Sequence, residues 1–199
     1  MRRDIVVVTC IMLILLSIGL TAPAYATQVL FKSPQDLGRE APLFIHGRVQ
    51  SVESYWNNEH TKIFTSTKIA VEETYKGSTG QTIEIVQLGG TVGRVKVSVQ
   101  GALGWKVGEE VLLFAEPYDA GTFQVSGFSQ GKFLVERDPA TGTAYVRAPA
   151  MEGIRLVGAP AANAPVPPVA SSLADRQRLT VEEFVNDVLG RSSQPGVEK

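Results

Sequence analysis

Hydrophobic and polar residues alternate along most of the chain between residues 44 and 146. The clearest example is segment 61–75, TKIFTSTKIAVEETY, in which Ile63, Ile69 and Val71 fall on one side together with two threonines. Alternation with a period of two over this length, in a segment rich in β-branched residues, predicts a long β-strand.

Further strands are predicted on both sides of a glycine turn. Segments 81–88 and 95–99 both alternate, and the Gly89-Gly90 pair between them predicts a hairpin. Residues 110–115 are almost entirely apolar, which predicts a central strand that is buried on both faces. Shorter strands, separated by Gly, Asp or Pro turn signals, are predicted at 123–125, 132–136 and 144–146.

Strands at this spacing, without a helical pattern between them, predict a mainly β fold. We expect a small barrel, closed or partly open, rather than a layered α/β sheet. Before the first strand, Ser33 followed by Pro34 predicts a short helix through Leu37, because a serine cap with proline in the first turn is a common helix start.

A second helix is predicted near the C-terminus. Thr180 and Glu183 have the spacing of a capping box, and apolar residues follow at one-face helical spacing up to Gly190. We expect this amphipathic helix to cover one surface or edge of the barrel. The alternative is that it docks on a partner.

The sequence predicts a cleaved segment at the N-terminus and a linker before the C-terminal helix. Residues 1–26 combine two arginines, an apolar run and the small-residue sequence AYA, which predicts an export signal cleaved after Ala26. A retained anchor is the alternative, but the apolar run is shorter than the ~20 residues that span a membrane. Residues 27–148 form the predicted barrel domain, 149–177 an Ala/Pro-rich linker, and 178–199 the C-terminal helix and tail.

The charge and cysteine content exclude some classes of partner and site. The 19 basic and 20 acidic residues nearly cancel, and no basic stripe is present, so we expect no nucleic-acid binding. Cys10 is the only cysteine and lies within the predicted signal, so the mature chain has neither a disulfide nor a thiolate metal site. We also expect no stable membrane span after signal cleavage.

The segment GFSQG, residues 127–131, matches the G-x-S-x-G pattern of a hydrolase nucleophile elbow. That motif needs a helix after the serine and a histidine later in the chain, whereas a strand pattern follows Ser129 and both His46 and His60 precede it. The two glycines are better explained as a sharp bend or bulge between strands. A serine hydrolase that uses Ser129 stays an alternative.

The two histidines do not predict a metal site. His46 lies in a predicted strand, and His60 stands beside Glu59, whose side chain would point to the opposite face of a strand. No further ligands are signalled at metal-site spacing. We therefore expect no cofactor, no metal and no catalytic set, with a metal enzyme using His46 and His60 as an alternative.

A contact surface is predicted in segment 54–61, between the first two long strands. Aromatic residues in an otherwise polar connection are typical of binding sites, and asparagines beside them offer adaptable hydrogen bonds. An equally weighted alternative is that the rings fold back and close the barrel end. The candidate binding residues are Tyr55, Trp56, Asn57, Asn58 and His60.

Three segments in order carry a resemblance to a known superfamily: APLFIHGRV at 41–49, a long strand closing on YKG at 75–77, and VGEEVLLF at 107–114. Together they resemble the netrin/TIMP-like OB barrel, and exported bacterial proteins with the same run of signals. The resemblance covers residues 41 to about 137. It implies a five-stranded OB-like Greek-key barrel with extra strands and a binding surface on the loop between its first two strands.

The resemblance does not carry an inhibitory mechanism with it. TIMPs bind a protease zinc through an N-terminal cysteine, which the mature chain lacks. The sequence instead predicts an exported, non-enzymatic binding or interaction module that contacts a protein, peptide or glycan in the cell envelope or outside. The alternatives are the exported serine hydrolase and a structural envelope protein.

Overall fold

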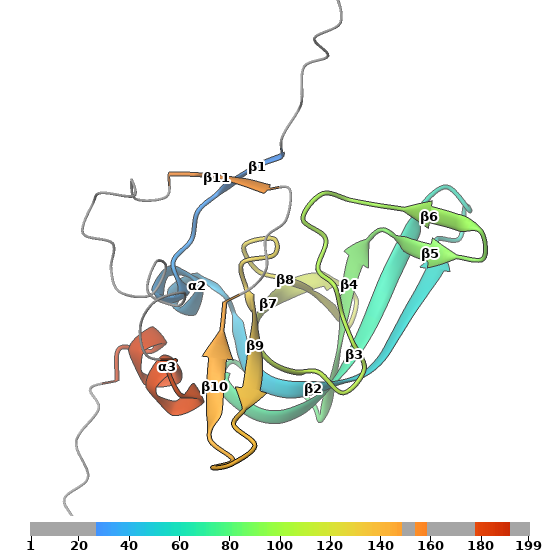
Figure 1. Ribbon diagram of the computed structural model, residues 1–199. Coiled ribbons are helices and arrows are strands. Elements are labelled where there is room, and N and C mark those ends of the chain that lie inside the picture. The colour runs from blue at the N-terminus through green and yellow to red at the C-terminus, as the bar shows by residue number, and fades with distance from the viewer. Residues whose placement is uncertain (1–26, 149–153, 159–177, 192–199) are drawn as a thin grey trace, which may run out of the picture.

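The computed structural model describes residues 27–148, 154–158 and 178–191, and the fold within them is mainly β (Figure 1). The predicted signal segment, most of the predicted linker and residues 192–199 lie outside the described residues. The elements are β1 (Thr27–Leu30), α2 (Pro34–Glu40), β2 (Leu43–Trp56), β3 (Ile63–Lys76), β4 (Thr82–Leu88), β5 (Gly90–Val92), β6 (Val95–Val97), β7 (Glu110–Asp119), β8 (Thr122–Val125), β9 (Lys132–Arg137), β10 (Ala144–Arg147), β11 (Ile154–Val157) and α3 (Val181–Val188).

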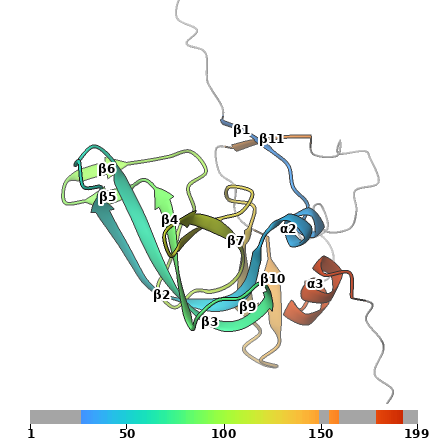
Figure 2. The same ribbon diagram turned by 180° about the vertical axis from the view of Figure 1, so that it is seen from behind.

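Five strands form a ring of hydrogen-bonded neighbours, which Figures 1 and 2 show from opposite sides. The order around the ring is β2, β3, β4, β8, β7 and back to β2. The β4–β8 pairing is parallel and the other four are antiparallel. β9 pairs with β7, and β10 pairs with β9, so the sheet continues outside the ring.

Strand β7 separates two hydrophobic cores. Val111, Leu113 and Ala115 belong to the core inside the ring, whereas Leu112 and Phe114 belong to a second core outside it. All five side chains are fully buried, because successive residues of a strand point to opposite faces and both faces are covered. The prediction of a central strand buried on both faces is confirmed.

The predicted hairpin across Gly89 and Gly90 is wrong. β6 pairs with β5, and the neighbours of β4 are β3 and β8. Both glycines have positive φ, and Gly90 packs directly against the side chains of Ser54 and Thr65. The chain therefore turns across the ends of β2 and β3 instead of returning along β4.

Both predicted helices are present and both begin with a capping box. Ser33 and Asp36 cap α2, which runs to Glu40 rather than ending at Leu37, and Thr180 and Glu183 cap α3. The apolar side of α3 enters the outer core through Phe184, Val185 and Val188. The helix thus covers the outside of the sheet beside β10 and α2, as Figure 1 shows.

A short parallel pairing joins the start of the described chain to a segment within the predicted linker. β1 pairs with β11 over four residues each. The buried side chain of Gln130 fastens the chain after β1, because its amide donates to the carbonyl oxygen of Leu30 and its oxygen accepts from the amide of Lys32. Within the described ranges, neither helix is long and apolar enough to cross a membrane.

Candidate functional site

The structure separates the two aromatic residues that the sequence assigned to one loop. Tyr55 and Trp56 are the last two residues of β2, where they pair with Phe64 and Ile63. Neighbouring residues of a strand point to opposite faces, so the two rings do not share a surface. The prediction that both lie in a loop is wrong because β2 and β3 stay paired to their ends.

The connection that follows, residues 57–62, is held by its own side chains. The Asn57 side-chain oxygen accepts hydrogen bonds from the amides of Thr61 and Lys62, both at 2.8 Å. His60 has a φ of 51° and stacks on Trp56, with ring centroids 6.3 Å apart. Asn57, His60 and Trp56 therefore shape this turn, and of the other candidates Asn58 and Tyr55 are exposed.

Tyr55 belongs to a larger apolar surface on the outside of the ring. Its ring lies 6.1 Å from that of Phe64, which in turn faces Leu88 across the β3–β4 pairing. Leu88 lines a groove together with Tyr118 and Phe128. We call these five residues the apolar strip; Tyr55, Leu88, Tyr118 and Phe128 are each 42% to 49% exposed.

The groove at the end of the apolar strip has a cavity volume of about 210 Å³. One wall is β4, the opposite wall is formed by the β7–β8 hairpin with Phe128, and the third is the connection after β6. Residues of that connection that line the groove are Val99, Gly101, Ala102 and Leu103. Sequence reasoning missed Leu88, Tyr118 and Phe128, which come together only when the ring closes.

Burial raises the pKa of the Tyr55 hydroxyl, and the nearby Glu84 and Tyr118 raise it further. Leu88 links the two parts of the apolar strip, because it pairs with Phe64 on one side and lines the groove with Tyr118 and Phe128 on the other. An exposed apolar surface of this kind on a folded protein commonly marks an interaction site.

A buried lysine fixes the third wall of the groove. The Lys132 ammonium donates to the carbonyl oxygen of Gly104 and to the Glu109 carboxylate, both at 2.6 Å, and lies 4.2 Å from the centroid of the Trp105 ring. Burial lowers the pKa of Lys132, while Glu109 acts in the opposite direction. The Gln87 side chain donates to the carbonyl oxygen of Leu103 and accepts a hydrogen bond from the Trp105 indole. Trp105 itself packs partly buried against the inner core.

We expect Lys132→Met to loosen this wall. The substitution keeps an apolar chain of similar length but removes both hydrogen bonds and the cation–π contact, and leaves Glu109 without its partner. Hydrogen–deuterium exchange of segment 99–105 should become about tenfold faster. Lys106→Met, an exposed change in the same connection, is the control; equal exchange in both variants would contradict the assignment.

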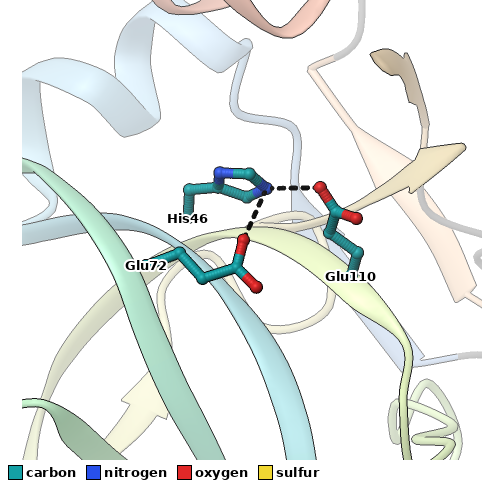
Figure 3. Close-up of side chains that lie close together, drawn as sticks. All are labelled: His46, Glu72 and Glu110. Carbon is teal, nitrogen blue, oxygen red and sulfur yellow. Dashed lines mark hydrogen bonds and ion pairs between the residues drawn. The ribbon is translucent and has the colours of Figure 1, made fainter. Parts of the chain in front are cut away.

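A second cluster of polar side chains lies on the outer side of β2, β3 and β7 (Figure 3). His46 Nε2 lies 2.9 Å from Glu110 Oε1 and 3.9 Å from Glu72 Oε2. Arg48 and Arg137 both donate to the Glu110 carboxylate, at 2.7 and 2.6 Å. His46 and Arg137 also line a groove between α3 and the β9–β10 hairpin.

The cluster has the donor atoms of a metal site but not its charge balance. One ligand atom each from His46, Glu72 and Glu110 lies within 4.8 Å of the others. Two guanidinium groups already occupy the Glu110 carboxylate, and their positive charges oppose a further cation. Burial raises the pKa of Glu110, but hydrogen bonds from the two arginines and His46 outweigh it and lower the pKa to about 2. We assign the cluster a structural role.

The geometry gives no support to the enzyme alternatives. Ser129 is 2% exposed, and its hydroxyl has no hydrogen-bond partner among the described residues. The chain after it enters strand β9 instead of a helix, as predicted, and Gly127 has a φ of 66° in the intervening bend. His60 follows the far end of β2 from His46, so the structure does not bring the two histidines together.

No model of a known protein family matches this sequence, and no curated protein matches it either.

Proposed function

We propose that this chain is an exported, non-enzymatic binding module with an OB-like Greek-key barrel, and that it contacts a protein, peptide or glycan through the apolar strip. If the five ring strands are numbered by their order in the chain, their order around the ring is first, second, third, fifth and fourth. The third and fifth strands, β4 and β8, are parallel. This order supports an OB-like barrel. Kinship with netrin/TIMP-like barrels rests on the three sequence segments at 41–49, 75–77 and 107–114.

The position of the apolar strip is the observation that carries the proposal. OB barrels bind their ligands on the face of their second and third strands and on the adjoining loops. Here the corresponding strands are β3 and β4, which provide Phe64 and Leu88. Tyr55 and Tyr118 stand where β2 and β7 approach their next turns. The strip therefore occupies the surface that an OB-like module would use.

Phe128 adds a second indication. Its backbone has a φ of 66°, a region that bulky residues rarely adopt, and its ring is 42% exposed beside the groove. Strained residues with exposed apolar side chains are found where a protein contacts a ligand. The bend at residues 127–131 thus serves to present an aromatic ring.

The test uses defined ligands. Purified protein is applied to a peptide array and an oligosaccharide array and compared with a Tyr55→Ala/Tyr118→Ala variant. Because a few aromatic residues dominate most interfaces, the variant should bind at least about tenfold more weakly. Val107→Ala, an exposed apolar residue outside the strip, is the control and should bind like the wild type. If the double variant binds as tightly as the wild type, the apolar strip is not the binding surface. If the wild type binds nothing on either array, the proposal of a binding module is refuted.

A further inference from the structure

The surroundings of the apolar strip are acidic. Glu53 on β2 and Glu84 on β4 lie on the same outer face as the strip. Glu53 is one cross-strand pair away from Tyr55, and Glu84 is two pairs away from Leu88. Glu116 faces Gln124, which lines the groove, and Asp119 directly follows Tyr118. None of these four carboxylates forms an ion pair within the described part of the chain. Lys68 stands opposite Glu84 across the β3–β4 pairing.

The groove also contains an unused strand edge. β8 pairs with β4 at a single register position, Ile85 with Phe123. The two strands then diverge, so that Gln87 and Leu88 of β4 have a strand partner on the β3 side but none on the other side among the described residues. Their side chains line the groove. A strand edge of this kind is a template for an added strand.

The size of the groove matches side chains rather than a whole small molecule. At about 210 Å³ it is smaller than the roughly 300–1,000 Å³ of sites that enclose drug-sized ligands. Its walls are mainly aliphatic and aromatic, with Gln87 and Gln124 as polar groups. An extended chain lying in the groove would place alternate side chains inward and the others toward the acidic rim.

We propose that the partner is an extended, basic polypeptide segment that pairs along the open edge of β4, with apolar side chains in the groove and cationic side chains facing Glu53, Glu84, Glu116 and Asp119. This inference rests on the proposed function and names its ligand. Main-chain pairing supplies affinity, and the groove and carboxylates supply selectivity. Nucleic acids and anionic glycans are repelled by the same carboxylates, and neutral glycans lack a peptide backbone to pair with the strand edge.

The experiment uses three short synthetic peptides of equal length. The first alternates leucine with lysine, the second alternates leucine with glutamate, and the third is the lysine peptide with alternate backbone amides methylated. Binding to the wild type is measured by calorimetry and compared with that of a Glu53→Gln/Glu84→Gln variant. These substitutions preserve size and let residue 84 still accept the hydrogen bond from Ser66. Glu182→Gln on α3 is the control.

The lysine peptide should bind to the wild type, and this binding should weaken with added salt, whereas the glutamate peptide should not bind. The methylated peptide should bind the wild type about tenfold more weakly than the lysine peptide does. The double variant should bind the lysine peptide about tenfold more weakly than the wild type does. Equal binding of the lysine and glutamate peptides would overturn the charge assignment, and full binding of the methylated peptide would overturn the edge pairing. Oligosaccharide binding that depends on Tyr55 and Tyr118, with no peptide binding, would overturn this inference and leave the proposed function standing. Absence of any binding that depends on those tyrosines would remove both.

Discussion

Replacing Glu110 with alanine should lower the free energy of unfolding by about 3 kcal/mol, because it removes a buried carboxylate that binds two arginines and a histidine. The lower end of the usual range for a broken buried pair applies, since the side chains of Arg48 and Arg137 are about half exposed and can be hydrated in the variant. Urea unfolding at neutral pH measures the change.

The same variant has a characteristic pH dependence. The pKa of Glu110 is lowered from 4.5 to about 2 in the folded protein. Its stabilising effect is therefore complete above pH 4.5 and is lost progressively as the pH falls toward 2. The wild type and Glu110→Ala should differ most at neutral pH and converge in acid. Glu59→Ala, in an exposed turn, should change the unfolding free energy by less than about 0.5 kcal/mol. A pH-independent difference would contradict the assignment.

Replacing Gly47 with alanine should destabilise the ring by about 3 kcal/mol. A Cβ atom at this position would lie 2.8 Å from Cγ2 of Ile69 and closer still to the carbonyl oxygen of Ala70. Backbone atoms of β3 cannot move aside as a flexible side chain can, so β2 and β3 would have to separate at the irregularity that already follows His46. Urea unfolding and the amide exchange of β3 report this change.

Gly80 provides a matched control. A Cβ atom there meets nothing within 4 Å, and its backbone is not in the left-handed region. Gly80→Ala should therefore leave the protein unchanged or stabilise it by roughly 0.4–1 kcal/mol, through a less flexible unfolded chain. Equal destabilisation by both substitutions would show that the close contact at Gly47 is not the cause.

Local patterns predicted most of the elements. Alternation located the long strand at β3, the apolar run located β7, and the capping boxes at Ser33 and Thr180 located both helices. These features depend on neighbours within a few residues of each other, which the sequence displays directly. The fold class follows from them for the same reason.

The sequence was a poorer guide to which strands pair with each other. The hairpin assigned to 81–88 and 95–99 was wrong because the contacts of Gly90 with Ser54 and Thr65 decide the direction of the turn. The sequence places Tyr55 and Trp56 in a loop because the residues that follow them are polar. Pairing with β3 instead extends β2 as far as Trp56.

The sites themselves depend on which strands pair with each other. Arg48, Glu110 and Arg137 lie on three different strands, and each taken alone is an ordinary charged residue. The only local sign was that Glu110 opens a buried strand, where an unpaired carboxylate would be unfavourable. The apolar strip is likewise assembled from β2, β3, β4, β7 and the bend after β8.

The proposed function requires that ligands bind on the outer face of β3 and β4 at the apolar strip. The most direct measurement is an amide chemical-shift map of the protein titrated with the tightest ligand from the arrays. The largest shifts should cluster at Tyr55, at the end of β4 and around Tyr118 and Phe128. Shifts confined to the groove beside α3, where His46 and Arg137 lie, would contradict it.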